Sequence, residues 1–350
     1  MKEAFVDKFL NVEVRDVPIP TPPPGQVLIK VVVTGTNPKD WKVPEMIAKE
    51  PTNSGDDIAG YVESVGDGVK GFAKGDRVAA FHEMTKPHGS FAEYALAWDY
   101  CTFHIPDSVS FEEAATIPLA AMTSAIGLFQ ILNLPPPFRP ATEPTPLLIY
   151  GGSSAVGAFA IKLAKAANIH PIIAVAGKAK GFVEDLVDKS KGDVVIDYRQ
   201  GDEAVVAQIN EVLKGRPLLH AYDAISESKT LPLVAKVLDK KGLVTTVLPT
   251  EPIEGLKVER TMVGWVHGPQ IPFAVKTVQG RQPGCAEFAV AYFKLFSWGL
   301  AYGWFSPHPH QVVEGGLDGL EKALRDLKDG KASAFKYVLR VGDTKGAGQK

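Results

Sequence analysis

The chain has 350 residues, of which 45% are hydrophobic, and its 38 basic residues nearly balance its 40 acidic ones. A sequence of this length and composition can fill two domain cores without disulfides or metals. Because the charges nearly balance, the sequence shows no excess of positive charge that would bind nucleic acid or an anionic membrane, so neither partner is expected. The two cysteines, Cys101 and Cys285, lie far apart and support neither a disulfide framework nor a cysteine metal site. The composition favours an enzyme that acts on a small molecule.

The amino-terminal residues 1–14 lack the basic stretch and apolar run of a signal peptide. No apolar segment is expected to reach the roughly 18 residues that a membrane span needs. The expected location is therefore the cytoplasm.

Short β-type runs interrupted by Gly, Pro and Asp fill residues 1–117, at 27–34, 59–65, 77–81 and 91–96. This pattern predicts an antiparallel, barrel-like domain. Residues 111–132 then show apolar positions at helical spacing.

Ser110 is the expected N-cap of this helical stretch, with Glu112 and Glu113 in its first turn. Six prolines in residues 134–146 predict an extended surface loop, which we interpret as a stiff connector.

From Leu147 onward, strand-like and helical segments alternate, which predicts a parallel sheet with helices on both faces. After about Trp265 we expect an aromatic-rich helix at 286–302, then an amphipathic helix and a closing strand that returns to the first sheet. Leu317, Leu320, Leu324 and Leu327 lie on one face of the amphipathic helix. The expected division is residues 1–117, 118–267 and 268–350, with the first and last segments forming one domain.

The segment 147–168 has the pattern of a buried strand, a small-residue turn and a helix, which is the context of a dinucleotide site. Gly152 is expected to form the tight turn and Gly157 to permit close packing of helix and strand. Ser154 stands at the usual middle glycine, where its hydroxyl could donate to a phosphate. With Ser153, Ala155 and Val156, these residues would surround a pyrophosphate at the helix amino terminus. The alternative is a purely structural turn.

The next strand ends at Gly177 without the Asp or Glu that would bind the ribose of NAD. Lys178 and Lys180 follow instead, and cations there would pair with a 2′-phosphate. The sequence therefore predicts NADPH as the cofactor. In the alternative interpretation, the two lysines only solvate a loop.

Five motifs follow one another in an order typical of one protein family: VLIKVVVTGTNPKDWK, SGDDIAG, GFAKGDRVAAF, GSFAEYA and LLIYGGSSAVGAFAIKLAK. Together they resemble zinc-independent medium-chain dehydrogenases/reductases of the quinone oxidoreductase type, especially the fungal ToxD-like proteins and trans-acting enoyl reductases. The resemblance implies an α/β fold, in which a doubly wound Rossmann domain accompanies a GroES-like, β-rich catalytic domain.

Zinc-dependent relatives place a cysteine and a histidine where this chain has Asn37 and Pro38, and a His-Glu pair where it has Asp56 and Asp57. Their four-cysteine structural zinc lobe has no counterpart here either. No metal is therefore expected.

The resemblance also implies roles for residues outside the glycine turn. Asn37 and Thr123 match positions that line the nicotinamide cleft, and Leu248 to Thr250 match a strand end beside the carboxamide. Tyr198 would pack near the adenosine ribose or its phosphate, although it could instead cap the sheet edge.

Without a metal, a conjugated acceptor is easier to reduce than a simple ketone, since its negative charge spreads onto a carbonyl oxygen held by donors. The resemblance places Lys42 near that cleft as the charged donor, although Lys42 could also be a solvated surface lysine. Asp40 could orient Lys42 or Asn37, or cap the following turn.

The leading hypothesis is the NADPH-dependent reduction of an activated C=C bond, with enoyl groups on a polyketide carrier among the substrates. Quinones or conjugated aldehydes are the first alternative, and a non-catalytic NADPH-binding protein is the second. Many quinone oxidoreductase relatives form dimers, whereas trans-acting enoyl reductases resemble monomers. The resemblance therefore leaves open whether this protein is a monomer or a homodimer.

Overall fold

The computed structural model describes residues 1–47, 49–268 and 285–349, which form two compact units. One unit combines Met1–Leu119 with Ala286–Lys350, and the other is Ala120–Cys285. The first boundary lies within a helix, two residues after the expected one at 117. The expected second boundary at 268 adjoins residues 269–284, which lie outside the described residues.

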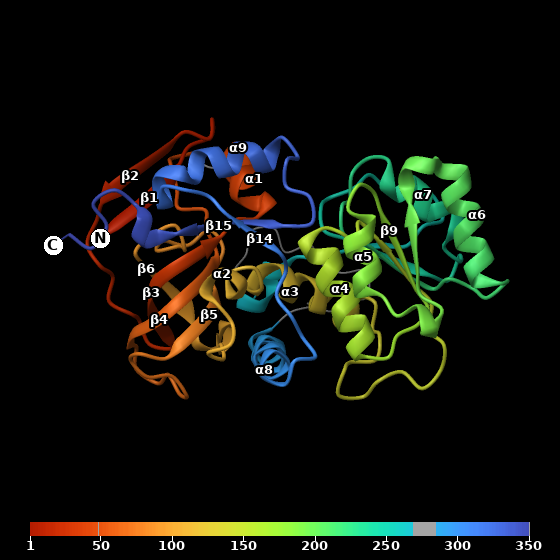
Figure 1. Ribbon diagram of the computed structural model, residues 1–350, viewed down its shortest axis with the longest axis horizontal. Helices are drawn as coiled ribbons and strands as arrows, with labels where there is room; N and C mark the ends of the chain where they lie inside the picture. Colours follow the sequence, from red (N-terminus) through yellow and green to blue (C-terminus); the bar gives the residue numbers. More distant parts are fainter. Residues whose placement is uncertain (48, 269–284, 350) are drawn as a thin grey trace. The chain divides into compact units, whose positions relative to one another are not determined.

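The unit that contains both chain ends is built on a seven-stranded sheet with the strand order β14-β15-β3-β4-β5-β7, in which β6 also pairs with β3 (Figure 1). The closing strand pairs antiparallel with β3, with Val338 opposite Gly35, as its alternating pattern predicted. Two further strands, β1 and β2, form a separate two-stranded sheet. The strands are β1 Lys2–Val6, β2 Val12–Asp16, β3 Gln26–Gly35, β4 Asp57–Val65, β5 Arg77–Phe81, β6 Tyr94–Trp98, β7 Thr102–His104, β14 His310–Val312 and β15 Lys336–Arg340.

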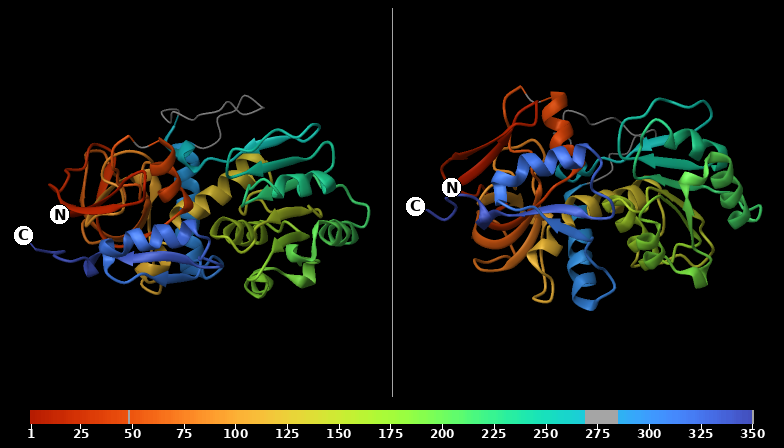
Figure 2. Two further views of the ribbon diagram at one scale, coloured as in Figure 1. Left: turned by 90° about the horizontal axis from the view of Figure 1, so that it is seen from above. Right: turned by 45° about the horizontal axis from the view of Figure 1, so that its top comes forward.

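Helices of this unit include α1 (Pro38–Ile47), α2 (Phe111–Ala114), α8 (Ala286–Tyr302) and α9 (Leu320–Lys328). Ser110 begins α2 with a capping box, in which its hydroxyl accepts from the amide of Glu113, as expected. The helix α9 runs beside α1 (Figure 2), where Lys328 lies over the ring of Trp41. The leucine face of α9 packs into the core beneath the sheet, as its spacing predicted.

The second unit holds a six-stranded, all-parallel sheet in the order β10-β9-β8-β11-β12-β13. Ile173 and Val175 pack in a core cluster that includes residues of α6 and α7, whereas Ala174 faces α4 and α5. Both faces are thus covered, which confirms the doubly wound α/β fold. The elements are β8 Leu147–Tyr150, α4 Ala155–Ala166, β9 Ile172–Ala176, α5 Lys180–Leu186, β10 Val194–Asp197, α6 Asp202–Leu213, β11 His220–Asp223, α7 Thr230–Val237, β12 Leu243–Thr246 and β13 Val258–Arg260.

The strand order reverses between β8 and β11, because β9 and β10 lie on one side of β8 and the later strands on the other. In open parallel sheets, ligands bind at the carboxyl ends of the strands at such a switch point. The loops after β8 and β11 therefore mark the edge at which a cofactor is expected.

The stretch Phe111–Ile131, which includes α3 (Pro118–Ala125), is long and apolar enough to cross a membrane. The expectation that no segment reaches this length was therefore wrong. However, 94% of its most apolar window is buried inside the protein, as in the core helix of a globular fold.

Candidate functional site

The turn between β8 and α4 is shaped by a glycine one position earlier than expected. Gly151, with φ of +83°, takes the left-handed conformation, and a Cβ there would lie 2.4 Å from Cγ1 of Ile225. Gly152 has an ordinary φ and lies beneath side chains of α4 and α5. Gly157 does have the expected packing role, since its Cβ would lie 2.2 Å from the carbonyl oxygen of Gly151. The backbone of this turn is therefore tightly constrained.

Ser154 is the N-cap of α4, and this differs from the phosphate-donor role that the sequence suggested. Its hydroxyl donates to the carbonyl oxygen of Gly151 at 2.9 Å and accepts from the amide of Gly157 at 3.0 Å. The hydroxyl hydrogen is thus already used within the turn. An anion would instead meet first-turn amides such as those of Ala155 and Val156, which have no intrahelical acceptor.

The carboxyl ends of β9 and β10 meet around the ring of Tyr198. A Cβ on Gly177 would lie 2.5 Å from Cε1 of this ring, so a side chain at the end of β9 would displace the ring. The ring also stacks on Tyr150, with 6.4 Å between centroids, and remains 48% exposed. Burial, with a smaller contribution from Asp223, raises the pKa of Tyr150 to about 12. Tyr198 therefore presents a half-exposed aromatic edge beside the turn.

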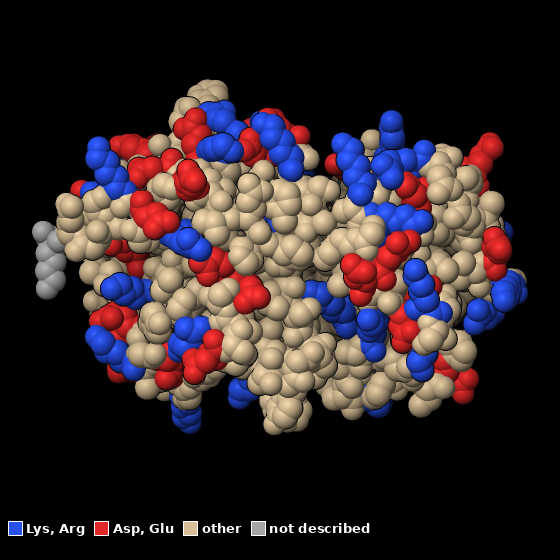
Figure 3. Space-filling model, in the orientation of Figure 1, with Lys and Arg blue, Asp and Glu red and all other residues tan. Residues whose placement is uncertain are grey.

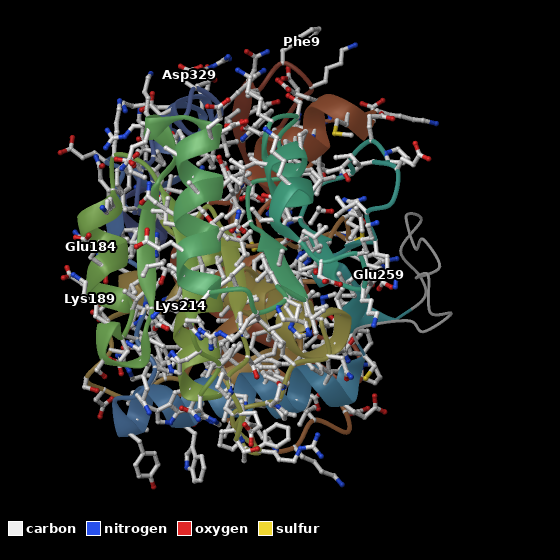
Figure 4. All side chains as sticks on the ribbon, turned by 90° about the vertical axis from the view of Figure 1, so that its right-hand side faces the viewer. Phe9, Glu184, Lys189, Lys214, Glu259 and Asp329 are labelled. Carbon is white, nitrogen blue, oxygen red and sulfur yellow. The ribbon has the colours of Figure 1, made fainter. Side chains whose placement is uncertain are left out.

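Three cations follow the ends of these two strands. Lys178 is exposed, and Lys180 pairs at 3.6 Å with Glu184 on the outer face of α5 (Figure 4). Arg199, which sequence reasoning missed, forms a two-pronged ion pair with Asp197. Hydrogen bonds from Arg199 lower the pKa of Asp197 to about 2. An Asp-x-Arg pattern at the end of an apolar strand was the signal that could have identified Arg199.

Thr123 lies close to the turn between β8 and α4. Its carbonyl oxygen accepts a hydrogen bond from the Tyr222 hydroxyl at 2.9 Å, and Tyr222 belongs to β11. The hydroxyl of the next residue, Ser124, donates to the carbonyl oxygen of Val156 in the first turn of α4 at 2.7 Å. Both contacts place Thr123 at the switch point of the sheet.

The loop after β12 contains the expected positions Leu248 and Thr250. The carbonyl oxygen of Leu248 accepts from the Thr246 hydroxyl at 3.0 Å, and the amide of Val247 donates to Ser226 Oγ at 2.9 Å. These bonds tie the loops after β11 and β12 together. Thr250 is half-buried.

In the other unit, Asn37 precedes α1 and is held by two carboxylates. Its backbone amide donates to Oδ2 of Asp40 at 2.7 Å, and its Nδ2 donates to Oδ2 of Asp57 at 2.8 Å. Three roles were considered for Asp40. Its hydrogen bond to the Asn37 amide is that of a residue capping the start of α1. Because an ionised carboxylate only accepts, Asp57 fixes which way the Asn37 side-chain amide faces.

The lysine of α1 that forms ion pairs with buried carboxylates is Lys39, not Lys42. Its Nζ lies 2.5 Å from Asp56 and 3.1 Å from Asp40, and it also donates to the carbonyl oxygen of Ser54. Lys42 is half-buried, with its Nζ 5.1 Å from the centre of the Trp41 ring. The sequence shows two lysines three positions apart and does not reveal which of them pairs with the carboxylates.

Asp56 also contacts Nδ1 of His82 at 3.1 Å, so Lys39 joins three buried titratable side chains in one cluster: Asp40, Asp56 and His82. Burial raises the pKa of Asp40 to about 7, against the attraction of Lys39. Burial acts upward on the pKa of Asp56 as well, but the nearer Lys39 and the His82 hydrogen bond outweigh it and lower that pKa. The positive charge of Lys39 therefore offsets the effect of burial on the pKa of Asp56 more fully than it does for Asp40.

Asp57 is the centre of a second buried ion pair, with Lys336 of β15. Its carboxylate also accepts from the amide of Leu119 at the start of α3, at 2.7 Å. Asp57 therefore ties together α3, β15 and, through Asn37, the start of α1. Within the described parts of the chain, no three His, Cys, Asp or Glu side chains form a group that could hold a metal ion.

Comparisons with known proteins identify the family and the fold of the chain. Residues 23–107 match the alcohol dehydrogenase GroES-like domain. Trans-enoyl reductase fsr4 of Gibberella fujikuroi is 44% identical over 323 residues, covering 91% of this chain and 92% of that protein. Trans-enoyl reductase resD of Aspergillus sclerotiorum is 33% identical over 94% of this chain and 96% of its own length. The crystal structure of CurK enoyl reductase superposes with a TM-score of 0.75 at 18% identity, covering 97% of this chain and 98% of that one.

Proposed function

Because the chain belongs to the trans-enoyl reductase family of the medium-chain dehydrogenase/reductase superfamily, we propose that it reduces a carbonyl-conjugated C=C bond with NADPH and without a metal. The observation that carries the proposal is the pair of ion pairs that Lys39 and Lys336 make with Asp56 and Asp57. Lysine side chains there satisfy the carboxylates that would otherwise attract a cation. The substrate class that fits a metal-free site is an enoyl thioester, including a polyketide chain on a carrier protein.

The residues of the second unit fit a dinucleotide. The turn from Gly151 to Gly157 leaves no room for added Cβ atoms at either end, and its helix amino terminus would hold the pyrophosphate. At the ends of β9 and β10, Lys178, Lys180 and Arg199 would hold a 2′-phosphate, with Tyr198 beside the ribose. When bound, NADPH supplies the hydride.

Replacing Lys178 with glutamate is expected to weaken NADPH binding by about 1.5–3 kcal/mol, the scale of a charge-assisted hydrogen bond, and to spare NADH. The reason is that only NADPH carries the 2′-phosphate. Fluorescence titration of both cofactors measures the two dissociation constants. Lys189→Glu is the matched control, because Lys189 precedes β10 at the opposite ends of the strands (Figure 4). Equal losses for both cofactors would show that Lys178 does not contact the phosphate.

The chain's own residues would act on the carbonyl of the acceptor. As the β-carbon is reduced, negative charge develops on the carbonyl oxygen, and donors placed there in advance stabilise it. Asn37 has a second amide hydrogen beyond the one held by Asp57, and Thr123 and Lys42 are the other donors proposed. Lys42 would also deliver the proton to the α-carbon, completing the addition of hydride and proton across the double bond.

Purified protein is expected to hold no stoichiometric zinc and to keep full activity in a chelator. The positions that bear zinc ligands in metal-dependent relatives carry Asn37, Pro38, Asp56 and Asp57, and three of these are hydrogen-bonded or ion-paired within the protein. Elemental analysis and an assay in chelator test this. One tightly bound zinc per chain would contradict it.

The proposed activity is tested by following NADPH oxidation with three acceptors: a carrier-linked enoyl thioester, a quinone and an unsaturated aldehyde. The highest kcat/KM is expected for the thioester. A preference for the quinone or the aldehyde would show that this acceptor, and not an enoyl thioester, is the substrate class. Cofactor binding without turnover of any acceptor would support a non-catalytic role.

A further inference from the structure

The helix that carries Thr123 changes its winding immediately afterwards. The α-helix α3 ends at Ala125, and Ile126–Ile131 forms a π-helical turn in which the amide of Leu132 donates to Gly127, five residues back, at 2.9 Å. Such turns are rare, and they often occur at functional sites. The surroundings must therefore hold this segment in a form that the chain alone does not favour.

One side chain, Tyr222 of β11, contacts both parts of this segment. Its hydroxyl donates to the carbonyl oxygen of Thr123, and its ring fills the space where a Cβ on residue 127 would lie, 2.2 Å from Cε2. Gly127 is thus the residue that lets the helix approach the ring. Tyr222 is fully buried, and burial raises the pKa of its phenol well above the usual value, so the hydroxyl remains a donor.

A second anchor acts on the adjacent residue. The hydroxyl of Ser124 contacts the carbonyl oxygens of Ala120 at 2.9 Å and Val156 at 2.7 Å. Thr123 therefore lies between a bond to β11 and a bond to the first turn of α4. The strand β11 flanks the switch point of the sheet, and α4 follows the other flanking strand, β8.

We propose that Tyr222 is a positioning residue of the reductase, which fixes the register of α3 so that Thr123 is held at the nicotinamide end of the cofactor site. This inference rests on the proposed function, in which Thr123 contacts the reacting carbonyl. Tyr222 itself touches neither cofactor nor substrate and acts through the backbone of Thr123.

The test is a double-mutant cycle of Tyr222→Phe and Thr123→Val, assayed on whichever acceptor the wild-type protein turns over best. Tyr222→Phe removes one oxygen and keeps the ring. We expect it to lower kcat by about fivefold to tenfold, the scale of one neutral hydrogen bond, with the dissociation constant of NADPH unchanged. In the Thr123→Val background, the same change should have little further effect, because the two residues act as one unit.

Tyr292→Phe is the matched control, since Tyr292 is a buried tyrosine of the other unit. It should leave kcat unchanged. A wild-type kcat for Tyr222→Phe, or equal losses in both backgrounds, would overturn the positioning role. So would a wild-type kcat for Thr123→Val.

Hydrogen exchange provides a readout that needs no turnover. Tyr222→Phe should speed amide exchange in residues 120–132, whereas residues of α5 should exchange as in the wild type. Faster exchange together with failure to reduce any acceptor would reject the proposed reaction and retain the anchor. Unchanged exchange would reject the anchor, whatever the reaction.

Discussion

Lys39→Met is expected to destabilise the protein by about 3–5 kcal/mol, the range for removing one partner of a buried ion pair. The substitution keeps an unbranched side chain that is one atom shorter, but leaves Asp40 and Asp56 without the lysine cation, and both carboxylates are almost completely buried. Four of the five tryptophans, all except Trp265, belong to the same unit as Lys39. Denaturant unfolding followed by tryptophan fluorescence therefore measures the loss in that unit.

Lys30→Met is the control, because Lys30 is an exposed lysine on β3 and its loss should change stability by no more than about 0.5 kcal/mol.

The effect of Lys39→Met should also depend on pH. The pKa of Asp40 in the folded protein is about 7, above its ordinary value of 3.8, because the buried carboxyl favours the protonated form. The protonated form contributes its full stability below pH 3.8, and this contribution is lost as pH rises through 7. The variant should consequently lose less stability at pH 5 than at pH 8. An equal loss at both would show that the carboxyl groups do not take up protons.

Lys42→Ala is expected to lower kcat by about 10²-fold or more while the affinity for NADPH barely changes, if Lys42 stabilises the developing enolate or supplies the proton. Lys39 is a poor substitute for this role, because its ammonium group is already held by Asp40, Asp56 and a carbonyl oxygen. Steady-state kinetics on a turned-over enoyl substrate, together with cofactor titration, separate chemistry from binding.

Lys328→Ala is the matched control for Lys42→Ala, since both lysines lie over the ring of Trp41, at 5.1 and 5.5 Å. Its kcat should equal that of the wild type. Lys42→Arg should recover little, because a guanidinium keeps the charge but does not readily release a proton. Substantial recovery would indicate a purely electrostatic role. A wild-type kcat for Lys42→Ala would leave Asn37 or Thr123 as the better candidate.

The features that sequence could predict are local or periodic. Continuous apolar runs alternating with helical spacing identified the parallel sheet, and Ser110 with Glu113 identified a helix start, because these signals depend on neighbouring residues. The glycine turn was located and Gly152 was expected to form it, but the left-handed residue is Gly151, because adjacent glycines cannot be told apart until backbone angles are known.

What sequence missed depends on contacts between distant segments. The ion pair of Asp57 with Lys336 joins residues 279 positions apart, and the bond from Tyr222 to Thr123 spans 99 positions. Neither contact produces a regular spacing of residues that could be recognised in the sequence. The mixture of acidic and basic side chains on the face drawn in Figure 3 shows why charge patterning alone could not single out the few buried pairs.

The pairing of Asp57 with Lys336 has a consequence for synthesis on the ribosome. The unit Ala120–Cys285 is continuous in sequence, so its described strands are available before residues 286–350 have been made. The other unit must wait, since β15 and the cation for Asp57 come from the carboxyl-terminal segment. Domains generally fold as units during translation. The unit Ala120–Cys285 can therefore fold first, whereas β3 lacks its partner strand and Asp57 of β4 lacks its cation until β15 has been made.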